Sequence, residues 1–219
     1  MINPLAKPLI LIGWLLAFPS SGYADTIRIS QPEHLQKTTD QCMFDIVYPV
    51  IAEPRFDKVV RCWIDHEMSR VSNKKAEAGE DPTFPNELWT TGEVHHSKDH
   101  LSVVLVSEVF FHGTNGGTSV KTFNFDLKTG RDPGLFDVID PKSGWFQVLF
   151  HFIKDKVHEI TPEYSSEAME PDSKDIHSFI FEGDQLVLYF DQCSIGPCAA
   201  EIIQVPIPMD QLKGVLLPR

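Results

Sequence analysis

The chain has 219 residues, and its 19 Lys and Arg against 31 Asp and Glu give a formal net charge of −12 at pH 7. This length suits one substantial domain with its own core. Basic residues are nowhere clustered, which argues against nucleic acid as a partner. After the first two dozen residues no stretch is long and apolar enough to span a bilayer, which takes about 20 residues.

The beginning of the chain has the pattern of a secretory signal peptide. A short leader containing Lys7 precedes an apolar run over residues 9–18, and a small, turn-prone segment ends at Ala24. A membrane anchor is the alternative, but the run is about half the length of a spanning helix. We therefore predict that residues 1–24 are removed and that the mature chain is periplasmic or secreted. Cleavage would leave 18 basic against 31 acidic residues, a net charge of −13.

The first part of the predicted mature chain contains one clear helix. Residues 25–41 are polar and weakly patterned, so they are interpreted as a lead-in to a domain over residues 42–219. A strand is predicted over 43–52. Apolar residues at helical spacing then predict an amphipathic helix over 54–75, and a Pro-rich loop follows over 79–88.

The middle of the chain alternates as strands do. Residues 89–98 and 101–111 are predicted to pair, and the second strand is apolar on both sides, as expected of a central strand. Residues 112–118 (HGTNGGT) are rich in types that tolerate positive φ and are predicted to form a turn. A further strand is predicted over 119–126, and a turn over 127–130.

The last third predicts a second helix and a hairpin. Apolar residues mark one face from Trp145 to Ile160, with Ser143 placed to cap the helix. An acidic loop is predicted next, followed by a hairpin, a last strand and a short closing helix, over residues 161–175, 176–190, 199–208 and 209–216. The predicted fold is a single α+β domain, with a largely antiparallel sheet, two main helices packed on it and a short C-terminal helix.

The four cysteines all lie in the predicted mature chain, which favours disulfides and allows three pairings. Spacing favours Cys42 with Cys62 and Cys193 with Cys198, since the second pair brackets a tight turn formed by Ser194, Ile195, Gly196 and Pro197. A zinc site is the alternative. It is disfavoured because residues 42 and 62 lack the short spacing of a zinc knuckle.

No motif for catalysis or metal binding is found in the sequence. His95 and His96 are neighbours on a predicted strand, so their side chains point to opposite faces. His96 and His100 flank a turn, but no carboxylate or cysteine completes a ligand set. Three aspartates in the middle of the chain lack the spacing of a calcium loop, namely Asp126, Asp137 and Asp140. We predict no catalytic residue, metal or cofactor.

Several short motifs occur in a characteristic order. They are Gly113-Thr114-Asn115-Gly116-Gly117, residues 123–130 (FNFDLKTG), residues 135–139 (LFDVI), the hairpin strand 186–190 with Gly196-Pro197, and Val205-Pro206-Ile207-Pro208. On these motifs, residues 101–216 resemble the extracytoplasmic domain of the RsiV anti-sigma factor, which is also found in PdaC-like bacterial envelope proteins.

The resemblance implies a binding module rather than a catalyst. In RsiV this kind of domain binds lysozyme, and PdaC-like proteins carry their deacetylase chemistry on a separate domain. The family loop often reads Tyr-x-Ile-x-Pro-Tyr-Ala, whereas residues 193–199 here read CSIGPCA. Both tyrosine positions have become cysteines, and a disulfide there would stiffen the loop and lower the entropic cost of ordering it on binding.

The leading hypothesis is a periplasmic binding protein that recognises or inhibits a basic cell-wall hydrolase. The hydrolase would be a host lysozyme or a toxin of a rival bacterium, in which case the chain is an immunity protein. We expect the contact surface to comprise the loop closed by Cys193 and Cys198 and the turn over residues 112–118. The predicted contact residues are His112, Asn115, Ser194, Ile195, Gly196 and Pro197. The alternatives are an envelope enzyme, in which Asp126, His112 and Asp137 would converge, and a structural or stress-related envelope protein.

Overall fold

The computed structural model describes residues 29–77, 81–162 and 172–218, so the predicted signal peptide lies outside the described residues. Within these ranges the chain forms two α-helices and eight strands. In order, they are β1 (Glu33–Thr38), β2 (Cys42–Tyr48), α1 (Pro54–Asn73), β3 (Asn86–His96), β4 (His100–Phe111), β5 (Thr114–Asp126), α2 (Trp145–Ile160), β6 (Ser178–Glu182), β7 (Gln185–Phe190) and β8 (Ile203–Pro208).

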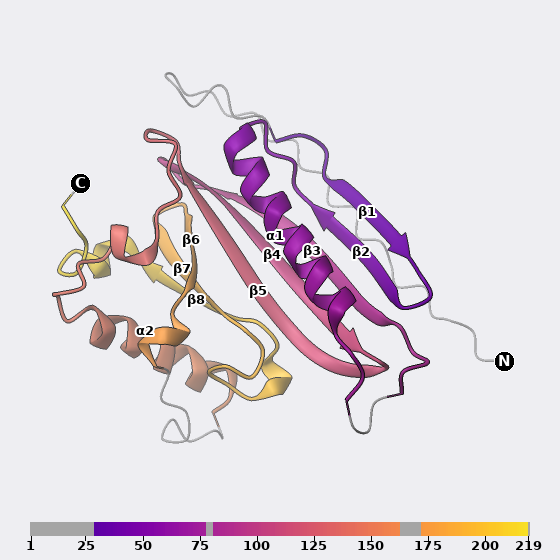
Figure 1. Cartoon of the computed structure of the whole chain (residues 1–219). Helices are drawn as coiled ribbons and strands as arrows, with labels where there is room; N and C mark the ends of the chain where they lie inside the picture. The colour runs from indigo at the N-terminus through magenta and orange to yellow at the C-terminus, as the bar shows by residue number, and fades with distance from the viewer. Residues whose placement is uncertain (1–28, 78–80, 163–171, 219) are drawn as a thin grey trace.

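The strands form two sheets, each covered by one helix (Figure 1). The larger sheet has the order β1-β2-β3-β4-β5, and the smaller has the order β6-β7-β8. Only β2 and β3 pair in parallel, because α1 connects them as a crossover helix; the other pairs are antiparallel. The predicted α+β fold with two main helices is confirmed, with the strands divided between two sheets. No helix in the described part of the chain is long and apolar enough to cross a membrane.

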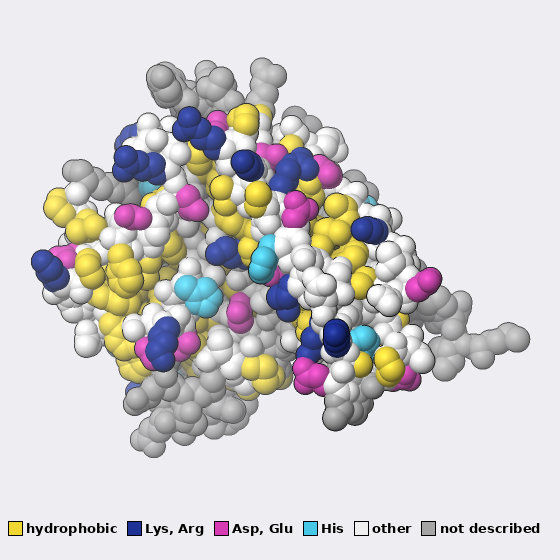
Figure 2. Space-filling view, viewed as in Figure 1, with side chains coloured by type: hydrophobic (Ala, Val, Ile, Leu, Met, Phe, Trp, Pro, Cys, Tyr) yellow, Lys and Arg dark blue, Asp and Glu magenta, His cyan; other side chains and the backbone are white. Residues whose placement is uncertain are grey.

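The first helix forms where the hydrophobic spacing predicts it. Pro54 occupies its first turn, where a missing N–H costs nothing, and the side chain of Glu53 accepts a hydrogen bond from the Arg55 N–H. Apolar residues of α1 face the larger sheet and form a core with it, among them Phe56, Val60 and Ile64. This packing leaves the opposite side of α1 to solvent, and Figure 2 shows Lys, Arg, Asp and Glu side chains spread over this face of the molecule.

The second helix covers the smaller sheet. Its buried residues recur every four positions, as an amphipathic helix requires, and they are Trp145, Leu149, Ile153 and Val157. The predicted cap at Ser143 is wrong. Gly144 is the N-cap residue, and the Ser143 hydroxyl instead donates to the Asp140 carbonyl oxygen at 2.6 Å. The hydroxyl is used within the preceding turn, so it does not reach the amides of the first helical turn.

The first strand, β1, lies in the segment that was interpreted as a lead-in. Its side chains are mostly exposed, so it lacks the apolar alternation that marks a half-buried strand. Backbone pairing with β2 holds it in the sheet. The Arg61 guanidinium of α1 adds an ion pair with Glu33 at 2.9 Å and donates to the Tyr48 hydroxyl at 2.7 Å. Burial and a hydrogen bond with Glu33 raise the pKa of Tyr48 to about 12.

The turn predicted over residues 112–118 is much shorter in the structure. His112 and Gly113 alone connect β4 to β5, with φ of 48° and 80°. Two successive positive φ values are typical of a type I′ hairpin turn. The glycines and polar residues that follow belong to β5, where a register shift near Val109 accommodates them. The many glycines and polar residues of this segment therefore mark the irregular start of a strand. Turn propensity alone does not distinguish such a start from a loop.

The two sheets meet where the free edge of β6 crosses β4 and β5. The Phe179 N–H donates to the Thr122 hydroxyl at 3.0 Å, and the Phe181 N–H donates to the Ser102 hydroxyl at 3.3 Å. The Asn124 side-chain amide donates to the Phe179 carbonyl oxygen at 3.0 Å. Three buried polar side chains of the larger sheet thus satisfy the backbone groups that an edge strand would otherwise bury without partners.

The end of the chain is more irregular than predicted. The last strand begins at Ile203, after a short 3-10 turn at Cys198–Ala200. The predicted closing helix is a 3-10 turn over Met209–Leu212. Its buried Leu212 contributes to the core under α2.

Candidate functional site

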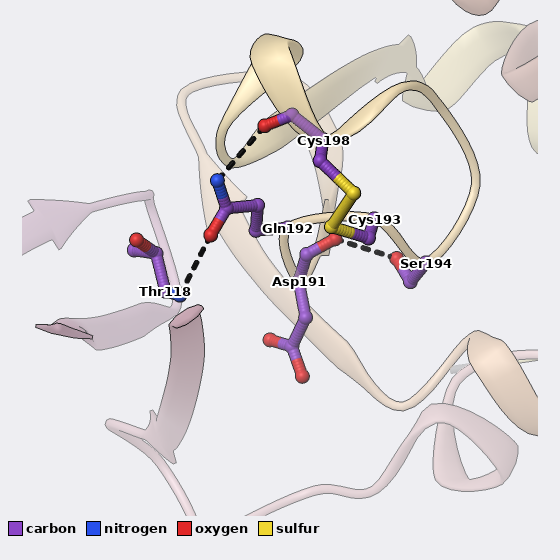
Figure 3. Close-up of a disulfide and its surroundings, with 6 residues drawn as sticks. All are labelled: Thr118, Asp191, Gln192, Cys193, Ser194 and Cys198. Atoms are coloured by element: carbon purple, nitrogen blue, oxygen red, sulfur yellow. Dashed lines mark hydrogen bonds between the residues drawn. A yellow bond between two sulfur atoms is a disulfide. The ribbon is translucent and has the colours of Figure 1, made fainter. Parts of the chain in front are cut away.

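The segment after β7, residues 191–200, is here called the cysteine loop (Figure 3). Its disulfide joins Cys193 to Cys198, as the spacing predicted. The Ser194 hydroxyl donates to the Asp191 carbonyl oxygen at 2.7 Å, and the Gln192 side-chain amide donates to the Cys198 carbonyl oxygen at 2.8 Å. The ring is therefore closed by one covalent bond and braced by two hydrogen bonds.

The start of the cysteine loop lies along the outer edge of β5. The Gln192 N–H donates to the Thr118 carbonyl oxygen at 3.1 Å, and the Gln192 side-chain oxygen accepts from the Thr118 N–H at 3.0 Å (Figure 3). The Asp191 carboxylate accepts from the Val120 N–H at 2.7 Å. Asp191 and Gln192 thus occupy hydrogen-bonding groups that an edge strand would otherwise expose, and they fasten the loop to the larger sheet.

Inside the loop, two of the predicted contact residues are buried. Ile195 is 1% exposed and packs in the core between α2 and the smaller sheet. Gly196 is also buried, and a Cβ there would lie 2.7 Å from Ile203 Cδ1. These two residues anchor the loop rather than face a partner. Ser194 is exposed and Pro197 is half-buried, and the exposed part of the loop also includes Cys193, Cys198 and Ala199.

The hairpin turn does not join the cysteine loop. The His112 N–H donates to the Asn86 side-chain oxygen at 3.2 Å, and His112 Nδ1 lies 3.1 Å from the Phe84 carbonyl oxygen. Asn115 is paired with Phe110 within the β4–β5 ladder. The loop meets β5 at Thr118, five residues after Gly113, which corresponds to roughly 17 Å along a strand. Within the predicted turn segment, the hydrogen bonds described above between the segment and the cysteine loop are made by its last residue, Thr118.

The predicted disulfide between Cys42 and Cys62 is wrong, and both thiols are free. Cys42 pairs in register with Asn86, whose side chain donates to the carbonyl oxygens of Val71 and Lys74 at the end of α1. Cys62 is exposed, nine residues before Val71, or about 13 Å along the helix axis. A disulfide requires Cα atoms within about 7 Å. The antiparallel course of α1 over β2 thus separates two cysteines that are only a short distance apart in sequence.

The three residues named above for the alternative of an envelope enzyme, His112, Asp126 and Asp137, lie apart. His112 and Asp126 lie at opposite ends of β5, and the Asp137 carboxylate accepts from the Gly134 N–H at 2.8 Å in a separate turn. The Asp126 carboxylate accepts from the N–H groups of Thr129 and Lys128, both at 2.8 Å. Burial alone would raise the pKa of Asp126, but these hydrogen bonds hold it below its usual range. Among the described residues no three His, Cys, Asp or Glu side chains are grouped as metal ligands.

Sequence reasoning missed an exposed tryptophan on β3. Trp89 is 43% exposed and points from β3 to the face of the larger sheet opposite α1. Its cross-strand neighbours are Asp45 on β2 and Glu108 on β4, and Glu108 is in turn paired with Thr118. The available signal was the alternation along β3, which puts Trp89 on the opposite side from the buried Leu88 and Thr90.

The fold of this chain is similar to that of proteins with solved structures. No family model matches the chain, and no curated protein matches it. Solved structures do. A DUF3298 family protein from Pseudomonas aeruginosa PAO1 is similar with a TM-score of 0.70 at 15% identity, over 90% of this chain and 97% of that one. A member of the same family from Bacteroides fragilis NCTC 9343 is similar with a TM-score of 0.61 at 13% identity, over 88% and 94% of the two chains. The chain therefore has the fold of DUF3298 family proteins.

Proposed function

We propose that the chain is an exported binding protein that recognises, and inhibits, a basic cell-wall hydrolase such as lysozyme. The observation that carries the proposal is the construction of the cysteine loop. It is closed by a disulfide, fastened to β5 by Gln192 and anchored in the core by Ile195, while Ser194 and Ala199 remain exposed. Such a pre-ordered loop on a rigid sheet loses little conformational entropy when it binds a partner.

The charge of the protein supports a basic partner. With the leader removed, 31 acidic residues stand against 18 basic ones. A net charge of this size and sign raises the rate of encounter with a cationic protein and is screened by salt. The resemblance to a lysozyme-binding domain and the location implied by the signal peptide point to the same class of partner.

Calorimetric titration of the mature protein with a basic lysozyme, and with hydrolases encoded beside its gene, tests the proposal. We expect a complex with micromolar or tighter affinity that weakens with salt. Replacing Ala199→Arg should weaken it by about tenfold or more, because the new side chain adds bulk and positive charge to the exposed loop. Ala52→Arg is the matched control, because Ala52 is also exposed but lies in the connection between β2 and α1.

Two results would contradict the proposal. One is the absence of a complex at micromolar concentration with every hydrolase tried. The other is an equal loss of affinity in both arginine variants, which would indicate unspecific charge attraction without a contact at the loop. A lysozyme activity assay on the same samples shows whether binding also inhibits the enzyme.

A further inference from the structure

One part of the larger sheet is not covered by any other element of the described part of the chain. On the face opposite α1, β6 crosses β4 and β5 and buries Ser102, Val104 and Thr122. The remaining part, here called the open face, runs from β1 to β4 and is centred on Trp89. Thr91 and Glu108, its neighbours on β3 and β4, are exposed as well.

The open face carries acidic side chains, and one of them, Asp45, is bound by His34 on β1, with 2.6 Å between His34 Nε2 and the Asp45 carboxylate. Alternation along β1 to β4 assigns four carboxylates to the strand positions of the face opposite α1, namely Asp45, Glu87, Glu93 and Glu108. None of the described strand positions of that face holds a Lys or Arg. Burial, aided by the charges of Glu182 and Glu93, raises the pKa of Tyr189 where the smaller sheet meets this face.

The indole of Trp89 is held in place at the centre of this surface. Its N–H donates to the Glu87 carboxylate at 3.0 Å, and Glu87 is two residues earlier on the same side of β3. The exposed ring therefore has carboxylates in its own strand and on both neighbouring strands, at Glu87, Asp45 and Glu108. Tryptophan is the aromatic residue that attracts cations best, and it is also enriched among residues that dominate binding energies.

The open face is continuous with the cysteine loop. One row of paired residues crosses the larger sheet from Asp45 through Trp89 and Glu108 to Thr118. Thr118 is the residue that Gln192 holds by its N–H and carbonyl oxygen. A partner seated on the open face would thus meet the cysteine loop at the edge of its contact area.

We propose that the open face receives an Arg or Lys side chain of the basic partner protein, with the cation over the Trp89 ring and beside Glu108. This inference rests on the proposed function for the partner's identity, and charge complementarity supports it. A guanidinium or ammonium group gains the attraction of the ring and of the carboxylates together. Binding would bury a tryptophan that is otherwise left in water.

Four variants of the mature protein test the site in the lysozyme titration. Trp89→Ala and Glu108→Gln should each weaken binding by about tenfold. Phe136→Ala removes another exposed aromatic ring, 53% exposed, and Glu159→Gln removes an exposed charge on α2. Both controls should bind as the parent protein does. Equal affinity of Trp89→Ala and the parent would overturn the inference.

A second measurement separates the site from the identity of the partner. The mature chain with isotope-labelled tryptophan gives indole N–H signals for Trp63, Trp89 and Trp145, and the Trp89 signal is identified by its loss in Trp89→Phe. Hexa-arginine should shift the Trp89 signal alone, and much less in Glu108→Gln than in Glu159→Gln. If lysozyme fails to bind but this shift occurs, the proposed function is wrong and the cation site stands. If hexa-arginine leaves the Trp89 signal unchanged, the site is wrong.

Discussion

At the scale of single residues, Asn86 shows how one buried amide connects three segments. Its side-chain NH2 group donates to the carbonyl oxygens of Val71 and Lys74, at 3.0 and 2.9 Å, and its side-chain oxygen accepts from His112. It thus ends α1, begins β3 and positions the β4–β5 turn. His112, which the sequence marked as a contact residue, has a structural role here through its backbone N–H.

We expect Asn86→Ala to lower the free energy of unfolding by about 2–4 kcal/mol, because it leaves buried donors and acceptors without partners. Urea unfolding followed by circular dichroism measures the change. Asn73→Ala is the control, since its side chain donates to the Ser69 carbonyl oxygen at an exposed site, and it should leave the stability nearly unchanged. Equal stability of Asn86→Ala and the parent would show that these hydrogen bonds contribute nothing net.

At the scale of secondary-structure elements, the outer edges of two strands are protected by different means. The edge of β5 is occupied by Asp191 and Gln192 of the cysteine loop. On β8, Pro206 and Pro208 pair in register with β7 and have no N–H to present on the other side. Both arrangements reduce the backbone donors available for pairing with another chain, which is a general requirement for stable sheet proteins.

The disulfide should stabilise the cysteine loop as an element. Replacing Cys193→Ser and Cys198→Ser together is expected to lower the free energy of unfolding by roughly 2 kcal/mol, the value for closing so short a ring. Cys62→Ser is the control, because Cys62 is exposed and unpaired and should have no effect on stability.

Counting thiols in the same proteins tests the pairing directly. Cys62 should react with a thiol reagent in the folded parent protein, and Cys42 only after unfolding, because it is buried. A parent protein with no reactive thiol after unfolding would show that Cys42 and Cys62 are joined after all.

At the scale of the whole molecule, the contact between the two sheets depends on buried hydroxyl and amide groups. Ser102, Thr122 and Asn124 would each be unfavourable in an apolar layer if they lacked partners. Here they match the N–H and carbonyl groups of β6. β6 covers only this part of the sheet, and within residues 29–77, 81–162 and 172–218 the rest of that side is the open face.

We expect Thr122→Val to lower the free energy of unfolding by about 1–3 kcal/mol, because the Phe179 N–H would lose its acceptor while the shape of the side chain is kept. Thr91→Val makes the same change at an exposed position of the larger sheet and should have little effect. Chemical denaturation of both variants measures the difference. A loss no greater than that of Thr91→Val would show that the hydrogen bond from Phe179 to Thr122 contributes nothing net to stability.

Local patterns predicted most of the elements correctly. Apolar spacing predicted both helices. The two apolar sides of β4 predicted a strand inside the sheet, and β4 lies between β3 and β5. The errors occurred where non-local contacts decide the structure. β1 has little apolar pattern and is held by β2 and Arg61, and the glycine-rich start of β5 is a strand because β4 pairs with it. Of the predicted contact surface, Ser194 and Pro197 remain at the surface, Ile195 and Gly196 are buried, and the turn residues lie apart from the loop.

The sequence by itself determined the α+β class, the two helices and the short disulfide at Cys193, because these depend on spacing within a few residues or turns. Only the tertiary structure decided which side chains share a surface. Strand order placed Trp89 and Glu108 in one row with Thr118, to which the cysteine loop is bound, and the course of α1 over β2 kept Cys42 from Cys62. Pairing between distant strands and the packing of a helix on a sheet depend on contacts across the chain, which local periodicity does not contain.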